Sequence, residues 1–182
     1  TKDAVLSELA KLYGEQHQWS EAYEVRKLLA EVDGPLATVR DQSILAFLEN
    51  ELGEEAMRLG NREQAAERFR AAIERDKKAA PAYLHLGDLH AQDGNFGLAM
   101  EAWEAMIDIA PERAYLAFDR LQDAAQKLGT PQRFVDLCRR IAAANPQDWR
   151  ARLALARHRF GAGDAAGALE AEERVVELRP GE

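Results

Sequence analysis

The sequence predicts an all-α fold, an α-solenoid of about five helix-turn-helix repeats that form a right-handed superhelix. The first observation is composition: Ala and Leu are abundant beside Glu, Arg and Gln, which are good helix formers, and aromatic residues make up only 7%. The second is that no stretch alternates polar and apolar residues with the period of a strand. The third is a pattern of small and apolar residues that recurs about every 34 residues, which indicates stacked helical hairpins.

The pattern is clearest over residues 80–111. Gly94 can adopt a positive φ, which ends one helix and lets the chain reverse, and Asn95 after it suits the N-cap of the next helix. Ala99 is small enough for two helices to cross closely, and Pro111 ends the second helix because proline lacks an amide donor. The positions that carry the pattern resemble a tetratricopeptide repeat (TPR), and they are Leu86, Gly87, Gly94, Phe96, Ala99, Trp103 and Pro111.

The same pattern occurs before and after this segment, so the resemblance to the TPR family extends along the chain. The other turn and crossing positions are Gly60, Ala65, Gly129, Gly163 and Ala168, with Asn61 and Asp164 placed as N-caps. We predict a single TPR domain over residues 1–182, with repeats at about 3–33, 46–78, 80–111, 113–146 and 149–180. An irregular join covers residues 34–45, where Gly34-Pro35 breaks a helix and the rest either extends the next helix or forms a loop.

Several segments also resemble one TPR subfamily, the lipopolysaccharide assembly protein B group of Gram-negative bacteria. They are Lys11 to Gln16 with Trp19 to Ala22, Phe47 to Ala56, Leu86 to Asp88, and Ala99 to Trp103. The resemblance implies a cytoplasmic adaptor, anchored at the inner membrane in the full-length protein, that presents the lipid A deacetylase to a membrane-bound protease. The sequence departs from the subfamily in carrying Asn50 in place of a Cys, and in having neither the zinc ribbon nor the membrane anchor. Because the chain starts at Thr1, we expect it to be a fragment that holds the TPR domain.

Composition and motifs argue against several classes of function. The net charge of −8 does not suit nucleic acid, which needs clustered Lys and Arg, and no apolar run is long enough to cross a membrane. Cys138 is the only cysteine, and we predict a buried structural thiol there. His85 and His90 are five residues apart, which is the wrong spacing for a helical zinc site, so packing is expected. We predict no metal, no cofactor and no enzymatic activity, because no catalytic constellation is present.

The predicted work of the chain is to bind a partner protein or peptide. In TPR arrays the first helix of each pair lines the concave face. The residues that we expect there are Lys11, Phe47, Asn50, Glu54, Leu84, Asp88, Leu116, Asp119, Asp123, Arg150 and Arg157. Their mixed charge suits a segment with a basic stretch and apolar anchors. For Trp149 we favour packing at the start of its helix over a position in the groove.

Our leading functional hypothesis is a cytoplasmic adaptor or scaffold of the lipopolysaccharide-assembly type. A generic TPR scaffold in another bacterial envelope or secretion complex is the alternative, and a metal-binding or enzyme-accessory helical domain is the remote one. The last helix, about 167–178, carries apolar residues but no polar capping helix follows it. We therefore expect either a further domain after residue 182 or self-association through this end.

Overall fold

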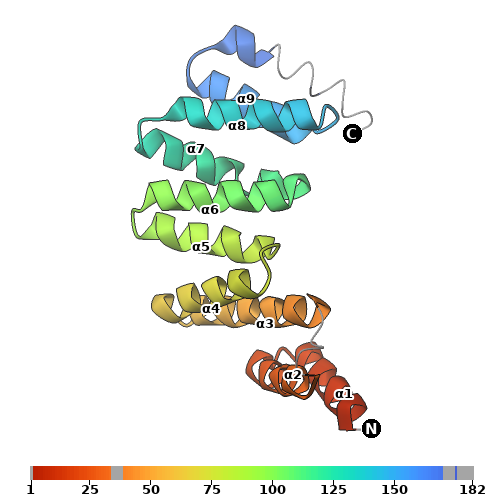
Figure 1. Cartoon of the computed structure of the whole chain (residues 1–182). Coiled ribbons are helices and arrows are strands. Elements are labelled where there is room, and N and C mark those ends of the chain that lie inside the picture. The colour runs from red at the N-terminus through yellow and green to blue at the C-terminus, as the bar shows by residue number, and fades with distance from the viewer. Residues whose placement is uncertain (1, 34–38, 170–174, 176–182) are drawn as a thin grey trace. The chain divides into compact units, whose positions relative to one another are not determined.

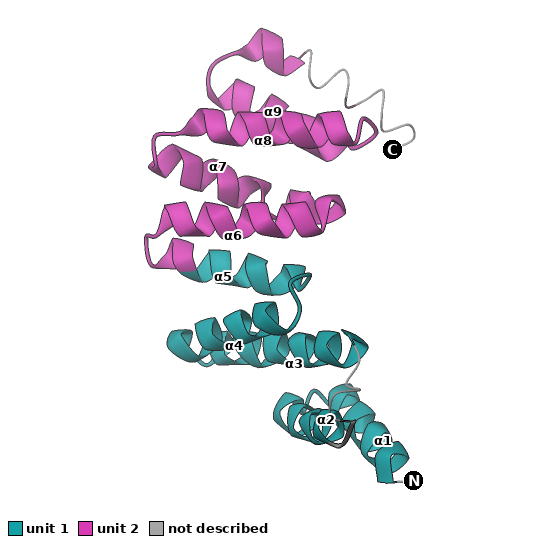
Figure 2. Cartoon of the chain, in the orientation of Figure 1, with its two compact units in different colours: residues 1–89 teal, residues 90–182 magenta. Residues whose placement is uncertain are grey.

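The protein is described here by a computed structural model that covers residues 2–33, 39–169 and 175. Helices account for all the regular secondary structure of these residues, in line with the predicted all-α class (Figure 1). The chain divides into two compact units, residues 1–89 and 90–182, and the division falls inside one helix (Figure 2). Whether the two act as one domain stays a prediction.

The first unit contains two complete helical hairpins and most of a fifth helix. The first hairpin is α1 (Lys2–Glu15) and α2 (Trp19–Asp33), and the second is α3 (Val39–Arg58) and α4 (Arg62–Arg75). Helix α5 (Ala80–Gln92) begins in this unit. Helix α3 starts at Val39 rather than at the predicted residue 46, so the described part of the join extends the helix. Four polar or β-branched residues before Ser43 do not prevent this, because helix propensities are weak compared with packing.

The second unit begins with the end of α5 and continues with α6 (Phe96–Ile109). The predicted first helix of the fourth repeat is divided into a 3-10 helix, η2 (Pro111–Leu116), and α7 (Phe118–Lys127). Pro111 stands at the start of η2, where its missing amide costs nothing. Helices α8 (Pro131–Ala144) and α9 (Trp149–Gly161) follow, and residues 165–169 are again helical. The predicted self-association through the last helix falls largely on residues outside the described ranges.

The turns inside the hairpins follow the sequence pattern. Gly94 has a φ of 78°, and the amide after it, that of Asn95, donates to the carbonyl of His90 at 2.9 Å. This left-handed residue reverses the chain after α5, and the equivalent glycines Gly60, Gly129 and Gly163 also have positive φ. The N-cap predictions are correct in position but only partly in chemistry. The side chains of Asn61 and Asn95 make no capping hydrogen bond, whereas Asp164 Oδ1 accepts one from the amide of Gly167.

Small residues allow the helices to pack closely. Ala65 and Ala99 are fully buried, and Ala168 nearly so, as predicted for the crossing positions. At Gly53 a Cβ atom would lie 2.5 Å from Cε1 of Phe69, so only glycine lets this buried ring rest on the α3 backbone. The ring joins a core cluster of Ala46, Ala56, Ala65, Ala72, Ala82 and Leu89.

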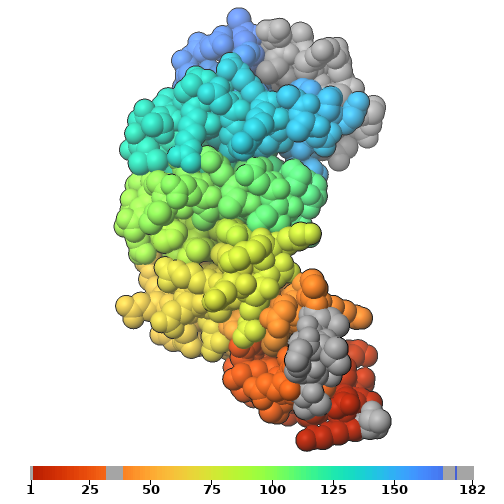
Figure 3. Space-filling view, viewed as in Figure 1, coloured from red at the N-terminus to blue at the C-terminus, as the bar shows by residue number. Residues whose placement is uncertain are grey.

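The second unit has its own apolar core. Met100 and Met106 of α6, Leu121 of α7 and Phe134 of α8 are all fully buried or within 1% of it. Cys138 is also fully buried, as predicted, and burial raises the pKa of its thiol to about 12. The space-filling view shows side chains filling the spaces that the ribbon view leaves between the paired helices (Figure 3).

Candidate protein-binding surface

A groove between the first helices of the two N-terminal hairpins gathers apolar and charged side chains. This α1–α3 groove has a volume of about 330 Å³, and its lining is Ser7, Glu8, Ala10, Lys11, Gly14, Trp19, Arg26, Ile44, Phe47 and Leu48. Phe47 is 53% exposed, although its ring packs nearly perpendicular to that of Trp19, with 6.0 Å between centroids. The helical period of α3 explains this exposure, because Leu45, Leu48 and Leu52 occupy the buried face and Phe47 points away from it. Lys11 lies at the rim, with Glu8 and Glu15 within 4.0 Å of its ammonium group.

The neighbouring surface, where α3 faces α5, is acidic. Glu54 Oε1 lies 3.0 Å from Nε2 of His85 and accepts a hydrogen bond of 2.9 Å from the amide of Asn50. The imidazole of His85 also stacks on Phe69, with 5.1 Å between ring centroids. Burial raises the pKa of the Glu51 carboxyl above its ordinary value, and the nearby Glu54 carboxylate raises it further, against the lowering effect of Asn50 and His85. The local field therefore favours a cationic group.

A second groove lies in the other compact unit, again between first helices of successive hairpins. This α7–α9 groove has a volume of about 260 Å³, and its lining is Tyr115, Phe118, Asp119, Gln122, Trp149, Arg150, Leu153, Ala154 and Arg157. The guanidinium carbon of Arg150 lies 4.6 Å from the centroid of the Tyr115 ring and 5.5 Å from that of Trp149. Trp149, the first residue of α9, thus lines the groove, whereas the sequence favours packing at the start of the helix.

The tetratricopeptide repeat family profile matches residues 50–114 and 136–182, which is more than half of the chain. The chain belongs to the tetratricopeptide repeat family. No curated protein matches its sequence.

Solved structures agree on the fold. MamA from Desulfovibrio magneticus RS-1 is 16% identical, with a TM-score of 0.58 over 98% of this chain and 95% of that one. Another MamA crystal structure gives 16% identity and a TM-score of 0.57 over 97% of this chain and 91% of that one. A putative kinesin light chain of TPR-like repeats from Podosopora anserina is 19% identical, with a TM-score of 0.54 over 96% and 93% of the two chains. At this identity the similarity establishes the TPR-like α-solenoid fold alone.

Both grooves lie between first helices of successive TPR repeats, where the sequence placed the partner-binding residues, and α2 adds Trp19 and Arg26 to the lining of the α1–α3 groove. The α1–α3 groove takes in Lys11 and Phe47, and the α7–α9 groove takes in Asp119, Arg150 and Arg157. The other residues of the predicted surface lie outside both grooves, and they are Asn50, Glu54, Leu84, Asp88, Leu116 and Asp123.

Two of these outlying residues have a different setting from the one predicted. Asn50 is only 5% exposed and bonds to Glu54 within its own helix, so it is a buried residue and not a groove contact. It falls among the inward-facing positions of α3, between the buried Glu49 and Leu52. Asp123 forms an exposed ion pair with Lys127 one turn later, at 2.6 Å. Both partners lie four residues later on the same helix, a spacing that the sequence shows, whereas the burial of Asn50 depends on the packing of α3.

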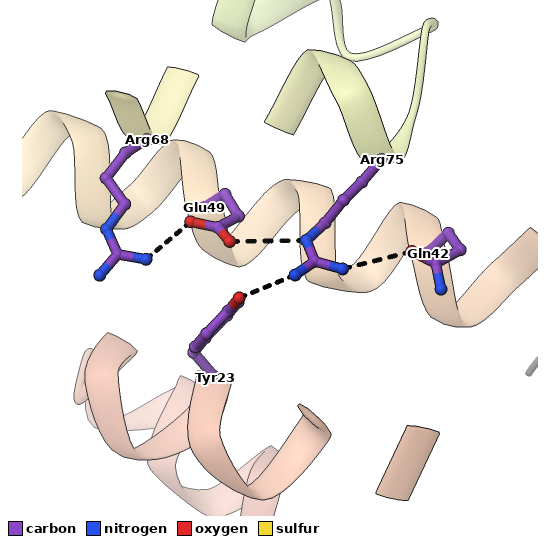
Figure 4. A network of polar contacts seen from close by, with 5 residues as sticks. All are labelled: Tyr23, Gln42, Glu49, Arg68 and Arg75. Atoms are coloured by element: carbon purple, nitrogen blue, oxygen red, sulfur yellow. Dashed lines mark hydrogen bonds and ion pairs between the residues drawn. The ribbon is translucent and has the colours of Figure 1, made fainter. Parts of the chain in front are cut away.

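The first unit also contains a buried polar network that the repeat pattern does not predict. Glu49 of α3 is 2% exposed, and its carboxylate accepts hydrogen bonds from Arg68 Nη1 at 2.8 Å and Arg75 Nε at 3.5 Å, both from α4. Arg75 also donates to the hydroxyl of Tyr23 on α2 at 2.9 Å and to Gln42 at 3.4 Å. Figure 4 shows the five side chains converging between α2 and the α3–α4 hairpin.

This network joins the first TPR repeat to the second. Burial raises the pKa of the Tyr23 phenol, the Glu49 carboxylate raises it further, and Arg75 opposes the change. The guanidinium carbons of Arg68 and Arg75 lie 5.7 and 5.8 Å from the centroid of the Tyr23 ring. The one signal in the sequence is that Arg68 and Arg75 are seven residues apart, which places them on one face of α4.

Metal ligands do not gather within the described ranges, where no group of three or more His, Cys, Asp and Glu side chains could hold an ion. None of the described helices is both long and apolar enough to cross a bilayer. The two grooves combine aromatic and aliphatic surface with charged groups, a combination suited to binding.

Proposed function

We propose that this TPR protein is an adaptor that binds a partner polypeptide through the first helices of its repeats. The observation that carries the proposal is the α1–α3 groove, where the half-exposed ring of Phe47 stands beside the charged Lys11, Glu8 and Arg26. Aromatic side chains at a concave site are frequent anchors of protein interfaces. Burying a fully exposed Phe side chain gains about 1.5–3 kcal/mol, so covering the exposed half of this ring gains about half of that. The surrounding charges select the partner.

The charges of the first unit suggest which kind of partner segment it binds. Beyond the groove, Glu51 and Glu54 form an acidic surface on α3, where burial raises the pKa of the Glu51 carboxyl and repulsion from the Glu54 carboxylate raises it further. A cationic side chain from a partner would relieve this repulsion. A segment with an apolar anchor for Phe47 and a basic residue for Glu54 therefore suits the first unit.

The test is selection of a random peptide library against the full chain, followed by affinity measurements on the recovered peptides. Replacing Phe47 by Ala should weaken at least one class of peptide about tenfold, which corresponds to about 1.4 kcal/mol. Leu28→Ala is the matched control, because Leu28 is 50% exposed on α2 and does not line the α1–α3 groove. Equal losses in the two variants, or none in either, would reject the first-helix surface. Thermal unfolding should confirm that both variants remain folded.

We propose more narrowly that the chain acts in lipopolysaccharide assembly as a cytoplasmic adaptor. This rests on the motif resemblance over four segments, Lys11 to Gln16 with Trp19 to Ala22, Phe47 to Ala56, Leu86 to Asp88, and Ala99 to Trp103. The test is direct binding of purified lipid A deacetylase to the chain, with the Phe47→Ala variant as comparison. Peptide binding without deacetylase binding would instead favour a TPR scaffold in another envelope or secretion complex.

A further inference from the structure

The α7–α9 groove is bordered by a basic helix, although the chain as a whole is acidic. The protein carries a net charge of −8, yet residues 149–159 of α9 include no acidic residue. They include four arginines, Arg150, Arg152, Arg157 and Arg159. Two of these arginines are occupied by backbone oxygens. Arg152 donates to the carbonyls of Pro146 and Asp148, and Arg159 donates to that of Gly167.

The other two arginines line the groove and have no such partner. Within the described part of the chain, neither the Arg150 nor the Arg157 guanidinium pairs with a carboxylate. Arg150 instead lies over two aromatic rings, Tyr115 and Trp149. Contact with aromatic rings does not use the N–H donors of a guanidinium as hydrogen bonds to carbonyls do, so the rings position Arg150 and leave donors for an acceptor.

The other residues that line the α7–α9 groove indicate which ligand group can lie beside a hydrogen-bond acceptor bound to Arg150. Phe118, Leu153 and Ala154 give apolar surface, and the volume of about 260 Å³ is below the range of about 300–1,000 Å³ typical of small-molecule pockets. A single large side chain of a polypeptide therefore matches the groove better than a cofactor does. Asp119 places one carboxylate on the opposite wall, which disfavours a uniformly anionic ligand such as a nucleic acid strand.

We propose that the α7–α9 groove binds a partner segment in which an aspartate or glutamate stands next to a large apolar residue. The carboxylate would bond to the edges of Arg150 and Arg157, and the apolar side chain would pack against Phe118, Leu153 and Trp149. This inference rests on the proposed adaptor function and extends it, because it assigns a second site, in the second unit, with a chemistry opposite to that of the acidic surface on α3.

The experiment uses the peptides recovered from the random library with the full chain. Those whose binding depends on Arg150 are identified by loss of affinity for the Arg150→Glu variant. Arg139→Glu makes the same change of charge at an exposed residue of α8 that does not line the groove, and it should leave their affinity unchanged. The dependent peptides should contain Asp or Glu beside a large apolar residue. Replacing that acid by Gln should weaken binding at least about tenfold.

A charge exchange separates recognition from simple damage to the groove. The peptide in which the acid is replaced by Lys should bind Arg150→Glu more tightly than it binds the unaltered chain. Peptides that depend on Arg150 but tolerate the change from acid to Gln would overturn the proposal, and so would an oligothymidylate that competes with them at equal affinity. If every recovered peptide depends on Phe47 and none on Arg150, this inference fails and the adaptor function stands. If no peptide binds at all, both fail.

Discussion

Replacing Glu49 by Gln should destabilise the first unit more than any exchange of a surface carboxylate. The carboxylate is 2% exposed and lies 2.8 Å from Arg68 Nη1 and 3.5 Å from Arg75 Nε. Gln keeps the shape and one acceptor but removes the charge that balances two guanidinium groups. Loss of one partner from a fully buried ion pair costs about 3–5 kcal/mol.

The expected cost here is smaller because the arginines are not fully buried. Their side chains are 34% and 28% exposed, so water screens part of the interaction. The remaining Gln oxygen also keeps one hydrogen bond, which is worth about 0.5–1.5 kcal/mol. We therefore expect a loss of about 2 kcal/mol for Glu49→Gln. With a urea dependence of about 2 kcal/mol per molar, the unfolding midpoint would fall by about 1 M.

The assay is urea unfolding combined with native-state hydrogen exchange, which assigns the change to α2, α3 and α4 even if the two units unfold separately. Glu104→Gln is the control, since Glu104 forms a more exposed pair with Arg133 at 2.8 Å and should cost less than about 1 kcal/mol. A double-mutant cycle between Glu49 and Arg75 isolates their interaction. A coupling near zero, or a loss no larger than that of Glu104→Gln, would refute the view that this network holds the first two repeats together.

Two further predictions concern the turns and the buried thiol. Gly94→Ala should lower stability by about 1–2 kcal/mol, because the φ of 78° at this position strains any residue with a Cβ. Gly97→Ala is the control and should be neutral or stabilising, because Gly97 lies in the first turn of α6 with open space around it. Equal shifts of the thermal unfolding midpoint in the two variants would contradict this prediction. Because burial holds the pKa of Cys138 near 12, the native thiol stays protonated while the unfolded one ionises, so stability should decrease as pH rises from about 9 to 12. This decrease should be smaller in Cys138→Ala, and equal pH dependence of the two unfolding midpoints would rule the mechanism out.

Much of the fold could be predicted because TPR positions have local physical causes. A glycine with positive φ ends the first helix wherever it occurs, and Gly60, Gly94, Gly129 and Gly163 all do so. Alanine at a crossing and an apolar stripe with the helical period fix which face of each helix is buried, as Ala65, Ala99 and Phe69 show. The boundary of α3 was less predictable, because nothing local opposes a helix between Val39 and Ser43 and packing decides where it begins.

The candidate binding surface was also predicted only in part from the sequence. The repeat register by itself placed Lys11, Phe47, Asp119, Arg150 and Arg157 on first helices, and they line the two grooves. Only the tertiary structure revealed that Asn50 is buried, that Trp149 and Tyr115 flank Arg150, and that Glu49 meets two arginines and Tyr23. The sequence determines periodicity, and periodicity determines which face of a helix is apolar. The pairing of polar side chains depends on the distance and angle between neighbouring helices, which packing of the whole hairpin sets.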